Sequence, residues 1–146
     1  MRPGRHPKVS EVNVLQLAYI STATPAVNEI EVRRILEQSQ RNNARDGVTG
    51  LLYFGGRRFL QVIEGPATAV EAAIARIQRD PRHHAIVTLS RREIDAREFG
   101  NWSMATTALA AIPPEVMLER VRALVAHASA NVRAQFESFV ALRPAA

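Results

Sequence analysis

Short apolar runs and helical apolar stripes alternate along the first 110 residues of the chain. Val14–Ser21 predicts a strand that carries apolar side chains on both faces and is buried on both sides. Asn28 and Glu31 have the spacing of a helix-capping pair, and an apolar stripe at helical spacing follows them as far as Asp46-Gly47. The chain therefore opens with a strand and a long helix.

A β-hairpin is predicted next. The apolar runs Val48–Phe54 and Phe59–Ile63 are joined around Gly55-Gly56, a dipeptide that suits a tight turn between strands. Thr68 and Glu71 repeat the capping spacing and predict a second helix with Pro81 beyond its end.

Three shorter elements are expected after the second helix. We predict a strand near Ala85–Arg92, one helical turn over Ile94–Phe99, and a last strand over Asn101–Thr107. The resulting order is β-α-β-β-α-β-β. This is the split-βαβ order with one extra strand, so the predicted fold class is α/β (α+β), with a ferredoxin-like sheet.

Two amphipathic helices are predicted after Pro113-Pro114. Their apolar stripes are Met117, Val121, Leu124, Val125 and Ala128, and Val132, Phe136, Phe139 and Val140. Such stripes are expected to pack on the bare face of the sheet or on another chain. We therefore divide the sequence into a polar tail (1–13), a main domain (14–110) and a C-terminal helical extension (111–146).

Composition narrows the class of protein. The 146 residues, 47% of them hydrophobic, suit one compact domain. The absence of cysteine excludes disulfides, thiolate metal sites, cysteine nucleophiles and cysteinyl adducts with a cofactor. A net charge of +5 from scattered arginines gives little support for nucleic-acid binding. No apolar run can span a bilayer, and Met1–Ser10 lacks the apolar centre of a secretory signal, so we expect a soluble, cytoplasmic protein.

Amide side chains stand where the apolar pattern calls for hydrophobic ones. Asn42 and Asn43 continue the inner stripe of the first helix, Gln61 lies in the middle of an apolar strand, and Tyr19 lies near the end of the first strand. An unpaired buried amide costs about 1–3 kcal/mol, so these groups face one another or a polar ligand. Taken singly, each has a plain structural explanation: Gln61 bonds to backbone or to Tyr19, and the asparagines occupy left-handed positions at a helix end.

Other candidate sites are weak. His83 and His84 are adjacent, so on a strand they point to opposite faces, and we interpret them as exposed structural residues rather than metal ligands. No glycine-rich phosphate loop is present. Glu64 has no acid, nucleophile or metal ligand near it in sequence, and we interpret it as a turn residue.

The amide positions lie within longer segments that resemble the BLUF family of flavin-dependent blue-light sensors, over roughly Val14 to Thr106. The segments that carry the resemblance are LAYIS, QRNNARDGVTGLLYF, FLQVIEG, RDPRH and FGNWSM. The second and third are long and nearly continuous, which makes the match specific.

The resemblance implies a role for each site residue. Tyr19 and Gln61 would be the photoactive pair beside the flavin ring, and Asn42, assisted by Asn43, would hold the carbonyl edge of the ring. Asp80 and Arg82 would provide polar contacts to the ring and ribityl tail, whereas Trp102 and Met104 would lie on the strand that transmits the signal. An amide offers a donor and an acceptor on one planar group, which suits the polar edge of such a ring.

The resemblance also implies a function. The chain is expected to be a blue-light photoreceptor that binds FAD, with FMN or riboflavin as alternatives, and rearranges the hydrogen bonds of Tyr19 and Gln61 without net chemistry. About forty residues follow Thr106, too few for a catalytic domain, so we expect no enzymatic activity and an output through an unidentified partner protein or a homodimer or higher homo-oligomer. The alternatives are a ferredoxin-like module that binds RNA or a small metabolite and, with less support, a flavin-dependent redox enzyme.

Overall fold

The computed structural model describes residues 14–55, 57–99, 105–108 and 114–141. Its elements follow the predicted order, β-α-β-β-α-β-β, and then two helices. The strands are β1 (Val14–Ala23), β2 (Thr49–Gly55), β3 (Arg58–Pro66), β4 (His83–Ile94) and β5 (Ala105–Ala108). The helices are α1 (Glu29–Asp46), α2 (Ala67–Arg79), α3 (Pro114–Leu124) and α4 (Ala130–Ala141).

The strands form one sheet in the order β4-β1-β3-β2-β5. The first four pair antiparallel, whereas β5 joins the edge of β2 in parallel. The order 4-1-3-2 with helices after β1 and β3 is the ferredoxin-like arrangement that the sequence predicts. It makes β1 and β3 neighbours in the interior of the sheet, where residues far apart in sequence face each other.

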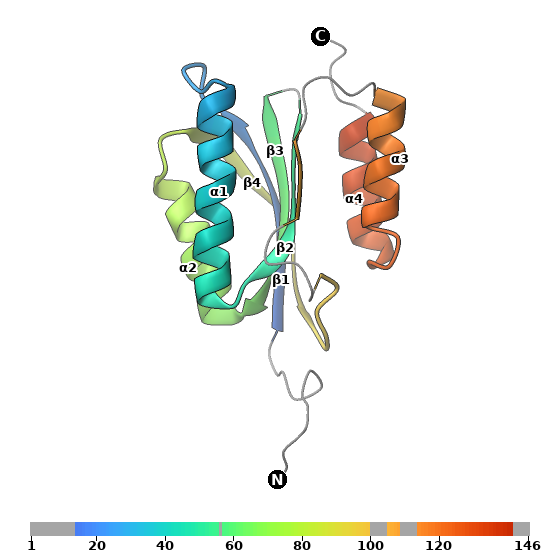
Figure 1. Ribbon diagram of the computed structural model, residues 1–146. Coiled ribbons are helices and arrows are strands. Elements are labelled where there is room, and N and C mark those ends of the chain that lie inside the picture. The colour runs from blue at the N-terminus through green and yellow to red at the C-terminus, as the bar shows by residue number, and fades with distance from the viewer. Residues whose placement is uncertain (1–13, 56, 100–104, 109–113, 142–146) are drawn as a thin grey trace.

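Helices cover both faces of the sheet. Figure 1 shows α1 and α2 on one side and α3 and α4 on the other. Side chains alternate along β1 accordingly: Leu15, Leu17 and Tyr19 join the core beneath α1 and α2, and Ala18 joins the core beneath α3 and α4. Side chains of α3 and α4 share a core with this face of the sheet, and the division of the chain at residue 110 stays a prediction.

Local signals account for the bounds of α1 and of the hairpin. The Asn28 side chain accepts a hydrogen bond from the Glu31 N–H at 2.9 Å, which satisfies one of the free donors of the first turn. Gly47 ends the helix with φ 74°, a conformation that glycine adopts without a steric penalty. At the hairpin, Gly55 pairs with Arg58, and Arg57 has φ 65°.

Two predicted details are wrong. The second helix begins at Ala67, directly after Pro66, and has no side-chain cap, because β3 runs straight into it before Thr68 is reached. Residues Ile94–Phe99 form no helical turn. The backbone N–H groups of Glu98 and Phe99 are instead bound by the Glu64 carboxylate, which replaces the bonds a helical turn would have supplied.

Some predicted features lie outside the described residues, namely the polar tail 1–13 and the signal-transmission residues Trp102 and Met104. Among the residues that the structure describes, no helix is long and apolar enough to cross a membrane.

Candidate functional site

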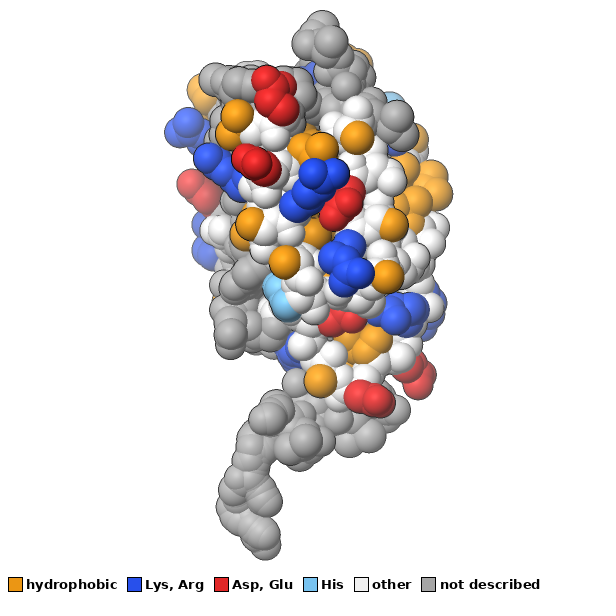
Figure 2. All heavy atoms as spheres, turned by 90° about the vertical axis from the view of Figure 1, so that its right-hand side faces the viewer, with side chains coloured by type: hydrophobic (Ala, Val, Ile, Leu, Met, Phe, Trp, Pro, Cys, Tyr) orange, Lys and Arg blue, Asp and Glu red, His pale blue; other side chains and the backbone are white. Residues whose placement is uncertain are grey.

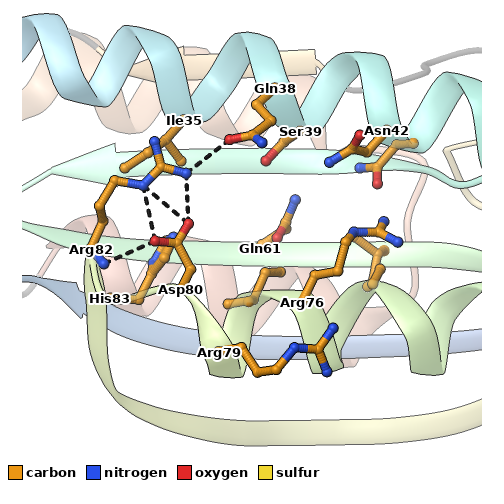
Figure 3. Close-up of a pocket in the computed structure, with 14 residues that line it drawn as sticks. Ile35, Gln38, Ser39, Asn42, Gln61, Arg76, Arg79, Asp80, Arg82 and His83 are labelled. Carbon is orange, nitrogen blue, oxygen red and sulfur yellow. Dashed lines mark hydrogen bonds and ion pairs between the residues drawn. The ribbon is translucent and has the colours of Figure 1, made fainter.

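A pocket of about 270 Å³ opens between α1, α2 and the face of the sheet that they cover. Its volume is close to the lower end of the roughly 300–1,000 Å³ typical of small-molecule sites. Figure 3 shows polar side chains from both helices and the sheet gathered around it. The lining residues are Ile35, Gln38, Ser39, Asn42, Asn43, Gln61, Ile63, Ala73, Arg76, Ile77, Arg79, Asp80, Arg82 and His83.

Tyr19 and Gln61 meet at the sheet side of this pocket. They are opposite each other in the β1–β3 register, and both are buried. The Tyr19 hydroxyl donates a hydrogen bond to Gln61 Oε1. Burial raises the pKa of the Tyr19 phenol above its ordinary value, so the phenol remains a donor at neutral pH. The Gln61 side chain extends from β3 into the space between α1 and α2 (Figure 3).

Asn42 and Asn43 lie inside α1, a turn before its end. Both line the pocket; Asn43 is buried and Asn42 half-buried. The left-handed position belongs to Gly47, and the Asn43 carbonyl accepts the N–H groups of Gly47 and Val48. The explanation of both asparagines as left-handed helix-end residues is therefore wrong. The prediction that their amides bind a ligand in the pocket stays untested.

Asp80 and Arg82 line one side of the pocket and bind each other. Arg82 donates to Asp80 Oδ2 at 2.7 Å and to Gln38 Oε1 at 2.9 Å (Figure 3). It also pairs with Glu31 at 3.7 Å. Burial raises the pKa of Asp80, but the hydrogen bonds from Arg82 outweigh it and hold that pKa below its ordinary value. The guanidinium is thus held beside the pocket by Asp80 and Gln38, and its contact with a flavin stays a prediction.

His83 is a member of the pocket that sequence reasoning missed. It opens β4 opposite Ala23, so it points to the same face as Tyr19, whereas His84 points away and is exposed. Its Nδ1 lies 3.1 Å from Ser21 Oγ and its ring packs against Phe59 at 4.7 Å. Burial lowers its pKa, which favours the neutral ring. The interpretation of His83 as an exposed residue is wrong, and the alternation that separated it from His84 was the signal that could have placed it here.

Basic side chains at the end of α2 were also missed. Arg76 and Arg79 line the pocket on successive turns, and Arg76 pairs with Asp46 at 3.3 Å. No group of three or more His, Cys, Asp or Glu side chains suited to a metal ion occurs among the described residues.

The donor set suits a flat organic ligand. Apolar side chains such as Ile35, Ile63 and Ile77 provide surfaces for a ring, and the amides of Asn42 and Gln61 can each donate and accept hydrogen bonds. The isoalloxazine ring of a flavin has this character, being apolar over its faces and polar along the edge of its carbonyls and ring nitrogens.

Comparison with known proteins identifies the chain. Residues 14–105 match the family described as BLUF, "Sensors of blue-light using FAD". This chain is a BLUF protein. The matched range contains all the pocket residues and both predicted signal residues, and FAD is the cofactor in the family's description.

Curated relatives carry the same domain within longer chains. Photoactivated adenylate cyclase subunit beta of Euglena gracilis is 31% identical over 108 residues, which are 71% of this chain and 13% of that protein. The blue light- and temperature-regulated antirepressor BluF of Escherichia coli is 36% identical over 74 residues, 51% of this chain and 18% of that one. The chain thus spans less than a fifth of the length of either relative.

Solved structures agree with the fold. BlrB, a BLUF protein in its dark state, is 31% identical and superimposes with a TM-score of 0.67 over 87% of this chain and 97% of that one. The BLUF structure of BlrP1 is 28% identical with a TM-score of 0.75, covering 90% of this chain and 93% of that one. These matches extend over most of the chain, beyond residues 14–105.

Proposed function

We propose that the chain is a blue-light photoreceptor that binds a flavin in the pocket between α1 and α2 and signals through the hydrogen bonds of Tyr19 and Gln61. The observation that carries this proposal is the buried Tyr19–Gln61 bond at the edge of a pocket lined by amides. Membership of the BLUF family supports the flavin, with FAD as the first candidate.

When bound, the flavin would supply absorption of blue light and an excited state able to accept an electron and a proton. The chain's own part follows from its geometry. The Tyr19 hydroxyl donates its proton in a hydrogen bond to Gln61 Oε1, and Gln61 in turn lines the pocket. An amide that turns about its side-chain axis exchanges donor and acceptor, so Gln61 can present two different hydrogen-bond patterns to one ligand edge.

The remaining pocket residues would bind rather than react. Asn42 offers an amide to the polar edge of the ring, with Asn43 beside it. Arg82, fixed by Asp80 and Gln38, offers a positioned cation to the carbonyl edge or the ribityl tail. Arg76 and Arg79 add positive charge along the same side of the pocket.

We propose further that the chain has no enzymatic activity and passes its signal to a partner protein, or to another subunit in a homodimer or higher homo-oligomer. The relatives named as cyclases are several times longer than this chain, and the match covers only 13% of the subunit beta of Euglena gracilis. The alternative of an RNA-binding sheet is disfavoured, because helices cover both faces of the sheet that bases would have to stack on.

The decisive experiment is an absorption spectrum of the purified protein before and after blue light. We expect a yellow protein with bound oxidised flavin and a reversible red shift. Gln61→Leu should keep the flavin and lose the shift, whereas Gln78→Leu, the same change on the exposed side of α2, should behave as wild type. A colourless protein that takes up no added flavin would contradict the proposal.

Binding and photochemistry should separate. Asn42→Ala leaves part of the ring's edge without a partner, a loss of about 1–3 kcal/mol that weakens flavin affinity roughly 5- to 150-fold. The red shift of the fraction that still binds should be normal. Asn131→Ala, on an exposed position of α4, is the matched control. Unchanged flavin affinity in Asn42→Ala would remove that residue from the site.

Trp102 and Met104 keep their predicted role in signal transmission as a proposal. Met104→Ala should preserve much of the red shift while reducing the light–dark difference in hydrogen exchange along Asn101–Thr107 and the C-terminal helices. Equal light–dark exchange differences in the variant and the wild type would count against it.

A further inference from the structure

A second pair of buried polar residues sits on the same two strands as Tyr19 and Gln61. Gln16 lies opposite Glu64 in the β1–β3 register, three positions along from the Tyr19–Gln61 pair. An odd number of positions along a strand places side chains on opposite faces, so Gln16 and Glu64 face α3 and α4. Both are fully buried, and Gln16 Nε2 donates to Glu64 Oε2 at 2.9 Å.

The interpretation of Glu64 as a turn residue is therefore wrong, because it lies inside β3 and its carboxylate binds backbone groups of another segment. Its two oxygens accept the backbone N–H groups of Glu98 and Phe99, each at 2.9 Å. These residues directly precede residues 100–104, the segment that contains Trp102 and Met104. The Glu64 carboxylate thus binds the two residues that precede the predicted signal strand in sequence.

Glu98 continues the chain of contacts to the C-terminal helices. Its carboxylate accepts the Ser129 N–H at 3.2 Å, and its backbone carbonyl contacts the ring of His127. Ser129 and His127 lie in the junction between α3 and α4. The His127 ring also packs edge-on against Phe99 at 5.4 Å.

Arg92 closes the cluster from β4. Its guanidinium donates to Gln16 Oε1 at 2.7 Å, to Glu98 at 3.3 Å and to Ser129 Oγ at 3.2 Å. Gln16 Nε2 also reaches Glu98, at 3.0 Å. Three strands, the segment before residue 100 and the α3–α4 junction therefore meet in one hydrogen-bonded cluster, made of Gln16, Glu64, Arg92, Glu98 and Ser129.

On the basis of the proposed light-sensing function, we propose that this cluster transmits the state of the Tyr19–Gln61 pair to the α3–α4 junction. The two polar pairs share the β1–β3 ladder, so a rearrangement that shifts the strands at one pair displaces the other on the opposite face. Because Glu64 binds the backbone of Glu98 and Glu98 binds Ser129, that displacement changes the hydrogen bonds of the α3–α4 junction.

Burial makes the response discrete rather than gradual. An oxygen of Glu64 that loses one of its buried donors cannot turn to water, because the residue is fully buried. The cluster therefore has either its full set of bonds or a different set, and packed groups of this kind switch between alternatives. Since Glu98 and Arg92 both bind Ser129, the α3–α4 junction follows the switch.

The test uses the full-length, flavin-loaded protein and two variants, Glu64→Gln and Glu98→Gln. Each keeps side-chain size but replaces one acceptor oxygen by a donor that faces other donors. Glu93→Gln, an exposed carboxylate of β4 outside the cluster, is the matched control. The measurements are the light-induced red shift, hydrogen exchange of α3 and α4 in the dark, and the light-minus-dark exchange difference.

We expect both cluster variants to keep the red shift and the dark protection of the helices but to lose the light-induced exchange difference. A difference of wild-type size in either variant would overturn the inference. Loss of the dark protection of α3 and α4 in both variants would also overturn the inference, because the cluster would then only stabilise the packing of the helices. Should Glu64→Gln fail to fold, Glu98→Gln decides alone, since Glu98 is only partly buried.

The two proposals fail in different ways. A wild-type chain without a red shift contradicts the proposed function, and this inference with it. A wild-type shift together with unchanged exchange differences in the variants contradicts only the role of the cluster.

Discussion

At the scale of single residues, the interior of the sheet holds two kinds of polar pair. The Tyr19–Gln61 pair faces a pocket, and the Gln16–Glu64 pair faces a packed core. A pair beside a pocket can exchange partners with a ligand, whereas a pair sealed in a core can exchange partners only within the protein. The first pair can therefore respond to a ligand, and the second can respond only to movements of the β1–β3 ladder that the two pairs share.

Removing the Tyr19 hydroxyl should separate flavin binding from photochemistry. Tyr19→Phe deletes the donor to Gln61 Oε1, costs about 1–3 kcal/mol of stability and leaves the pocket-lining amides in place. We expect bound flavin with no red shift under blue light. Tyr53→Phe, a buried tyrosine that packs on Phe139 under α4, is the matched control and should shift normally. A normal shift in Tyr19→Phe would refute the photoactive pair.

Glu64 should make stability depend on pH in an unusual direction. Burial raises its pKa above the ordinary value of 4.5, although the hydrogen bonds from Phe99, Gln16 and Glu98 oppose this and the Glu98 charge adds to it. Arg92 on β4 is the nearby cation, bound to Gln16 and Glu98. The folded state therefore holds the Glu64 proton more tightly than the unfolded state. Its contribution is present below pH 4.5 and is lost as pH rises through the raised value.

Denaturation of wild type and Glu64→Gln between about pH 4 and pH 8 measures this contribution. Other groups titrate in both proteins, so the difference in unfolding free energy isolates Glu64. We expect the advantage of the wild type to shrink as pH rises. An advantage that grows with pH would mean that the pKa of Glu64 lies below its ordinary value.

At the scale of elements, periodicity predicted most of the fold. Each strand and helix gave an apolar pattern with turn or capping residues beside it, such as Asn28 before α1 and Gly47 after it. The start of α2 and the segment before residue 100 were mispredicted. There, a strand running into a helix and a buried carboxylate 34 positions away from Glu98 decide the backbone, and no local pattern records either contact.

The site divides in the same way. Tyr19, Asn42, Asn43, Gln61, Asp80 and Arg82 were predictable because they stand in the segments that resemble the BLUF family, and the structure places all but Tyr19 on the pocket lining, with Tyr19 bonded to Gln61. Strand alternation separates His83 from His84, but choosing which of the two faces the pocket required the β1–β4 register, which the assembled sheet supplies. The partnership of Gln16 and Glu64 required the β1–β3 register in the same way.

The β2–β3 hairpin depends on close backbone approach at Gly50. A Cβ at this position would lie 2.0 Å from the Val62 carbonyl oxygen, so Gly50→Ala must push the two strands apart. We expect a loss of about 1–3 kcal/mol or more. A Cβ at Gly47 would meet no atom within 4 Å. The cost of Gly47→Ala is therefore only the strain of an alanine at φ 74°, about 1 kcal/mol. Denaturant midpoints that rank the two variants in the opposite order would contradict the hairpin geometry.

At the scale of the whole molecule, one sheet separates a ligand side from a helix-packed side. Val121, Val125, Val132, Phe136 and Val140 of the C-terminal half are buried against the sheet or each other. Figure 2 shows the outer face of these helices with charged side chains of both signs among scattered apolar ones. The C-terminal helices therefore complete the fold on one side and present a mixed surface on the other.

The apolar side of the sheet should become an aggregation surface when the helices are lost. Cutting the chain after Ala111 removes α3 and α4 and uncovers Leu51, Tyr53 and Leu60, while every residue of the flavin pocket is kept. We expect a normal flavin spectrum together with self-association, seen as light scattering and binding of an apolar dye. Phe136→Asp, which places a charge in the buried seam of the full-length chain, should move in the same direction, whereas Ala134→Asp on the exposed side of α4 should not. A truncated chain that stays monomeric and binds no dye would show that the helices do not shield the sheet, and their packing would then have to be explained by signalling alone.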